Sequence, residues 1–151
     1  MSENPQAHAV RPDERGLAYS VRILVRHPSE SLDCITTSTG MLPNILHRAG
    51  DQRVNPAGKP LSGQFPHSTW SWWEEFRDSR DFSLGVARTI DVLAPAADLL
   101  SRLRSSGGEV NVILHLRGER NIGASIRTRE LARMVELGID FGIEVFPHTN
   151  E

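Results

Sequence analysis

Residues 109–117 read EVNVILHLR, and residues 128–146 read TRELARMVELGIDFGIEVF. In the first segment apolar residues alternate with polar ones, and Ile113 is the one apolar residue on the polar side. The apolar side consists of Val110, Val112, Leu114 and Leu116. A period near two predicts a strand that buries one face against a core.

The second segment changes period within its length. Leu131, Met134 and Val135 lie at helical spacing, and Gly138 suits the left-handed residue that ends a helix. Alternation then returns in Ile139, Phe141, Ile143 and Val145, before Pro147. Together the two segments predict a strand, a helix of about ten residues and a second strand.

The preceding residues add further elements. A strand is predicted from Ala18, a weak helix ends at Gly40, a short strand lies near residues 45–48, and residues 68–76 form a tryptophan-rich strand. A helix containing Phe82, Val86 and Ile90 breaks at Pro95 before a second helical run. We therefore predict an α+β fold: a single, mostly antiparallel sheet of four to five strands with helices packed on one face.

Residues 52–68 contain several prolines and glycines, and we predict a long loop there. A loop of this length is typical either of a functional surface or of a mobile segment, and the sequence leaves both interpretations open.

Length and composition limit the organisation and the class of protein. The 151 residues suffice for one domain, predicted at 17–147, between a flexible tail at 1–16 and a short one at 148–151. The net charge of −2, without long charged blocks, lacks the signature of a general nucleic-acid binder. No apolar run approaches a membrane span, the beginning is polar, and one cysteine forms no internal disulfide, so we expect a cytoplasmic protein.

Four short motifs together resemble a bacterial family known as domain of unknown function 4279. They are Gly40-Met41-Leu42-Pro43, Arg48-Ala49-Gly50-Asp51, the tryptophans at 70–73, and residues 131–145. The long 52–68 segment and the threonine-rich first helix depart from that family's pattern. The resemblance implies a small bacterial cytosolic α+β domain, and it implies no activity, cofactor or catalytic residue.

Three groups of residues are candidates for a site. His47, Asp51 and His67 offer imidazole and carboxylate ligands for a transition metal, although Gly50-Asp51 also suits an ordinary turn. Arg117, Arg120 and Arg127 can bind an anion, although interleaved glutamates also suit a solvated surface of weak ion pairs. The third group is Trp70, Trp72 and Trp73.

The tryptophans are the candidate partner-binding residues. Alternation places Trp70 and Trp72 on one face of the strand and Trp73 on the other, so one side of the sheet cannot bury all three rings. Burial of Trp73 under the 52–68 segment is the competing interpretation. An unpaired sheet edge, either residues 139–146 or the tryptophan strand, leaves a homodimer open.

Two functional hypotheses follow. The first is a non-enzymatic adaptor or neutralising protein that binds an unknown protein partner through its tryptophan surface and uses no cofactor. The alternative is a small metal-binding or hydrolytic enzyme that uses His47, Asp51 and His67.

Overall fold

A computed structural model describes residues 19–77, 79–117 and 123–146. Its main sheet has five strands in the order β2-β5-β1-β6-β7. Neighbouring strands are antiparallel except β6 and β7, which are parallel. Their bounds are β1 Tyr19–His27, β2 Ile45–His47, β5 Ser68–Phe76, β6 Glu109–Arg117 and β7 Asp140–Phe146. The predicted α+β fold with a mostly antiparallel sheet is confirmed.

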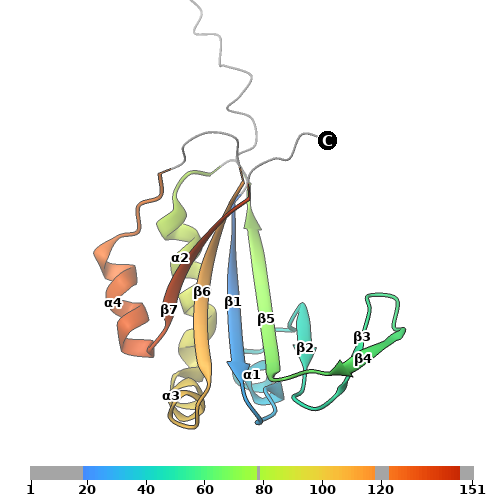
Figure 1. Cartoon of the computed structure of the whole chain (residues 1–151). Helices are drawn as coiled ribbons and strands as arrows, with labels where there is room; N and C mark the ends of the chain where they lie inside the picture. Colours follow the sequence, from blue (N-terminus) through green and yellow to red (C-terminus); the bar gives the residue numbers. More distant parts are fainter. Residues whose placement is uncertain (1–18, 78, 118–122, 147–151) are drawn as a thin grey trace, which may run out of the picture.

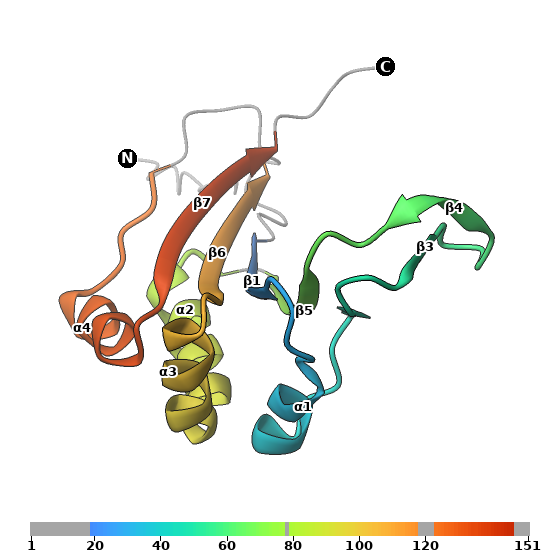
Figure 2. The ribbon, with the colours of Figure 1, turned by 60° about the horizontal axis from the view of Figure 1, so that its bottom comes forward.

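The helices lie on one face of this sheet (Figures 1 and 2). They are α1 Asp33–Thr39, α2 Phe82–Leu93, α3 Ala97–Ser105 and α4 Thr128–Leu137, with a 3-10 turn, η2, at Ala94–Ala96. Pro95 lies inside η2, so the helical run breaks where its ring predicts. The Asp81 carboxylate accepts a hydrogen bond from the Leu84 backbone N–H and caps α2.

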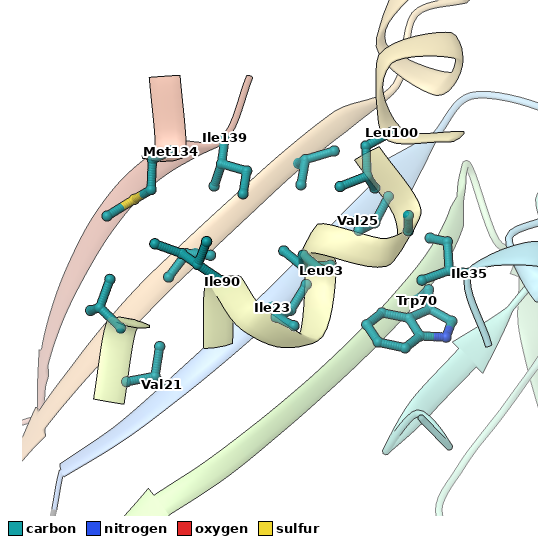
Figure 3. Close-up of a cluster of buried hydrophobic side chains, with 14 of the residues drawn as sticks. Val21, Ile23, Val25, Ile35, Trp70, Ile90, Leu93, Leu100, Met134 and Ile139 are labelled. Carbon is teal, nitrogen blue, oxygen red and sulfur yellow. The ribbon is translucent and has the colours of Figure 1, made fainter. Parts of the chain in front are cut away.

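Alternation along β1 and β6 creates the core between sheet and helices. Figure 3 shows Val21, Ile23 and Val25 of β1 facing the helical layer, with Ile23 close to Leu93 and Val25 close to Leu100. All of these side chains are fully buried. Gly138 ends α4 in the left-handed conformation with a φ of 65°, as predicted, and β7 begins two residues later.

The 52–68 segment is not the predicted unstructured loop. It contains a hairpin of β3, Gln52–Val54, and β4, Pro60–Gln64, which form their own two-stranded sheet. The turn closes because Asn55 exchanges hydrogen bonds with Lys59, and Gly58 adopts a φ of 76° that favours glycine. The hairpin projects from the β2–β5 end of the molecule, away from α4 (Figures 1 and 2).

The two predicted tails, residues 1–16 and 148–151, lie outside the described residues. Among the helices that are described, none is both long and apolar enough to span a membrane.

Candidate functional site

One face of the five-stranded sheet carries none of the described helices (Figure 2), and we call it the open face. The strand registers determine which residues share it. Arg22 of β1 lies between Trp73 of β5 and Ile113 of β6, and one row further along Ser20 lies beside His115. In that second row His115 is next to Glu144 of β7. Side chains from four strands therefore meet on one surface.

The three tryptophans divide between the two faces as alternation predicts. Trp70 is fully buried and its indole Nε1 donates a hydrogen bond to Thr36 Oγ1 at 3.0 Å. Trp72 is half-buried against the same core. Trp73 is on the open face with 39% of its surface exposed. Trp70 is thus a core residue, and its predicted role in partner binding is wrong because no partner can reach its ring in this fold.

The surroundings of Trp73 hold it in place. Its backbone N–H donates to Asn44 Oδ1 at 3.0 Å, and the Arg22 guanidinium carbon lies 5.9 Å from the centre of its ring. Arg22 Nε donates to Ser71 Oγ at 2.7 Å, and Ser71 in turn donates to the Ile23 carbonyl. Partial burial lowers the pKa of Arg22. The result is an exposed aromatic ring on a pre-ordered polar support.

His115 and Glu144 form the polar group beside Arg22. Glu144 Oε2 lies 3.3 Å from His115 Nε2 but out of line for a hydrogen bond, and Nε2 is buried without a hydrogen-bond partner in the described structure. Phe146 lies beside the imidazole, with 5.5 Å between ring centres. Burial lowers the pKa of His115, and Arg22 and Arg117 lower it further, while Glu144 opposes this shift.

Acid should weaken the fold through this histidine. Because the pKa of His115 in the folded protein is below its ordinary 6.5, the unfolded chain binds the proton more readily. The contribution of His115 to stability is therefore complete above its ordinary pKa, and it decreases as the pH falls from that value towards the pKa of His115 in the folded protein. We expect a lower Tm at about pH 5 than at about pH 7.5, and a smaller difference between these two Tm values in His115→Gln. Most carboxylates are still ionised at about pH 5, so they contribute little to this difference. Differential scanning calorimetry at both pH values tests this.

His47 contributes in the same direction, since burial also lowers its pKa. The double variant of His115→Gln with His47→Gln should therefore show the smallest difference in Tm between the two pH values. An undiminished difference in both variants would assign the acid sensitivity to other groups.

The predicted metal ligands lie near the base of the hairpin. The His47 ring stacks on Phe65 with 3.7 Å between ring centres, and both His67 and Asp51 are close enough to influence its pKa. However, the described residues include no group of three or more His, Cys, Asp or Glu side chains arranged to hold a metal ion. The geometry instead gives His47 a role in attaching the hairpin to the sheet.

The structure describes two of the three arginines predicted to bind an anion. Arg117 is exposed at the end of β6, and Arg127 forms an ion pair of 2.9 Å with Asp81 at the beginning of α2. Arg120 lies outside the described residues. Of the two arginines that are described, Arg127 is thus already paired with a carboxylate, and anion binding by this group stays a prediction.

A Ser-His-Glu cluster that no sequence pattern indicates joins the end of β1 to the end of α3. His27 Nε2 lies 3.0 Å from Ser106 Oγ, which donates to Glu30 Oε1 at 2.6 Å. This resembles a nucleophile paired with a base, but His27 Nδ1 accepts from the backbone N–H groups of Ser29 and Glu30. Nε2 must then carry the hydrogen, so it donates to Ser106 and cannot remove the hydroxyl proton. The cluster is structural.

The described residues form a small α+β domain whose candidate site lies on the open face, around Trp73. No family model, curated protein or solved structure matches this chain. The resemblance based on the four short motifs accordingly stays a prediction.

Proposed function

We propose that this protein is a non-enzymatic binding domain that holds a protein partner on its open face, with Trp73 as the central anchor. The observation that carries the proposal is Trp73 itself, a large aromatic side chain exposed on a sheet face that no described helix covers. Aromatic residues of this kind contribute a large share of binding energy at protein interfaces.

Rigidity supports an anchoring role. The Asn44 hydrogen bond fixes the backbone of Trp73, and Arg22 sits near its ring. A side chain that is ordered before binding loses little conformational entropy when a partner packs against it. Ile45, on the same face of the adjacent strand β2, extends the apolar part of this surface.

The hairpin supplies a second contact in this proposal. Every residue of β3 and β4 is exposed, including the apolar Val54 and Leu61. Two-stranded hairpins gain little stability by themselves in water, and contact with a partner would bury these side chains. The His47–Phe65 stack connects the hairpin to the open face.

The test has two stages. Affinity-tagged protein is incubated with native lysate, lightly cross-linked and analysed by mass spectrometry, beside Trp73→Ala and the control Leu84→Ala. Leu84 is an equally suitable apolar control because it is 50% exposed, but it lies on α2 at the helical side of the molecule. A partner should be captured by the wild type and the control and lost from Trp73→Ala.

The dissociation constant is then measured by calorimetry with the purified partner. Truncation of a central aromatic anchor costs about 2 kcal/mol or more, so Trp73→Ala should weaken binding by at least about thirtyfold. Equal affinity of Trp73→Ala and the wild type, with both proteins folded, would contradict the proposal.

A further inference from the structure

The free edge of the sheet at β7 carries a second, unrelated surface. The seven-residue strand β7 has β6 on one side and no described strand on the other, whereas the opposite edge strand, β2, has only three residues. Its outer backbone groups are therefore available to pair with another strand. Figures 1 and 2 both show β7 and α4 at the same side of the molecule, opposite the hairpin.

Apolar side chains accompany this edge. Ile143 and Val145 are on the helical face of β7 and are 52% and 56% exposed, because α4 does not cover them. On α4, Arg133 contacts Asp91 of α2. Leu131 and Val135 are each two residues from Arg133, which is about 200° around the helix axis. Because Arg133 faces α2, these two side chains point away from α2. Val135 is 79% exposed.

We infer that β7 pairs antiparallel with β7 of a second copy of this chain, about a two-fold axis centred on Ile143. With the axis perpendicular to the sheet, each residue faces a residue on the same side of the combined sheet. Ile143 then faces Ile143 of the second copy, and Phe141 faces Val145 of the second copy. The contact between the two β7 strands, which we call the seam, is therefore entirely apolar on its helical side. On the open face Asp140 faces Phe146, and Gly142 faces Glu144.

Charge selects this register over its neighbours. An axis centred on Glu144 places that carboxylate opposite its own copy, and an axis centred on Gly142 places Asp140 opposite Glu144. Like charges directly opposite each other destabilise a sheet. Axes further along leave most of the strand unpaired. The register centred on Ile143 pairs all seven residues and opposes no carboxylates.

The same axis gives α4 a neighbour. Leu131 and Val135 face outward from the β7 edge, where α4 of the second copy would lie across the seam. Both open faces would point in the same direction, which presents the two Trp73 side chains on one continuous surface. The dimer does not depend on the proposed function, because it uses different residues and a different side of the molecule.

Light scattering coupled to size-exclusion chromatography tests the dimer. The molar mass that light scattering gives for the wild type should be twice the 16.8 kDa of one chain. Ile143→Glu and Ile143→Lys should each be monomeric, because the axis brings two like charges together. Leu42→Glu, a matched control at an 81% exposed apolar residue next to β2, should remain dimeric.

Mixing the two charged variants tests the register. If residue 143 faces its own copy, equimolar Ile143→Glu and Ile143→Lys should restore a dimer, which also shows that both variants are folded. A monomeric wild type at tens of micromolar, or an unchanged dimer in Ile143→Glu, would overturn the inference. Two monomeric variants that fail to recombine although circular dichroism shows both to be folded would overturn the register.

Discussion

Replacing Trp70 by alanine is expected to lower the free energy of unfolding by about 3 to 5 kcal/mol. The ring is fully buried among α1, β1 and β5, close to Ile35 (Figure 3), and its truncation leaves a cavity that a packed core fills poorly. It also removes the donor to Thr36 Oγ1. Because the free energy of unfolding of a domain of this size is about 5 to 15 kcal/mol, Trp70→Ala should be only marginally stable. Urea denaturation followed by circular dichroism measures the difference.

Trp73→Ala is the matched control, since the residue type and the strand are the same. Its ring is on the open face, so we expect a loss of at most about 1 kcal/mol. A large loss in Trp73→Ala would identify it as a structural residue and remove the basis of the binding proposal. A small loss in Trp70→Ala would contradict the arrangement of the core.

The contrast between these tryptophans follows from sequence alternation, and so does much of the fold. The β6, α4 and β7 elements each have one apolar face with a clear period, so local pattern defines them. Gly138 and Pro95 mark boundaries for reasons that act within a few residues. Where the structure depends on such local chemistry, the sequence predicts it.

Strand order depends instead on contacts between distant residues. β1 lies between β5 and β6, which begin 41 and 82 residues after β1 ends. Nothing in the sequence of β1 specifies those neighbours. The sequence therefore places Trp73 on the face opposite Trp70 and leaves its exposure open. It does not predict that Arg22, His115 and Glu144 share that face, because the sheet brings them together from separate strands.

The sequence pattern does not predict the hairpin, for a different reason. Prolines and glycines normally indicate irregular structure, but here Pro60 begins β4, and Pro56 and Gly58 lie in the turn between β3 and β4. The Asn55-Pro-Ala-Gly58 sequence is the signal that would have predicted the turn. His47 likewise looks like a metal ligand in the sequence, and only the fold shows its stacking on Phe65.

His27→Ala is expected to lower the free energy of unfolding by about 2 to 3 kcal/mol. The imidazole is 2% exposed and connects the end of β1, the turn that follows it and the end of α3. It accepts hydrogen bonds from two backbone N–H groups of the turn and donates one to Ser106. Alanine removes these bonds and leaves the space of the ring partly empty. Chemical denaturation followed by circular dichroism measures the loss.

A double-mutant cycle with Ser106→Ala shows whether the hydrogen bond itself is stabilising. Ser106→Ala alone should cost about 1 kcal/mol, since it removes the hydroxyl between His27 and Glu30. If the two side chains interact as the structure shows, the double variant should lose at least about 0.5 kcal/mol less than the two single losses combined. Additive losses would mean that His27 stabilises the domain by packing alone. A His27→Ala protein as stable as the wild type would contradict the stabilising role of the buried imidazole.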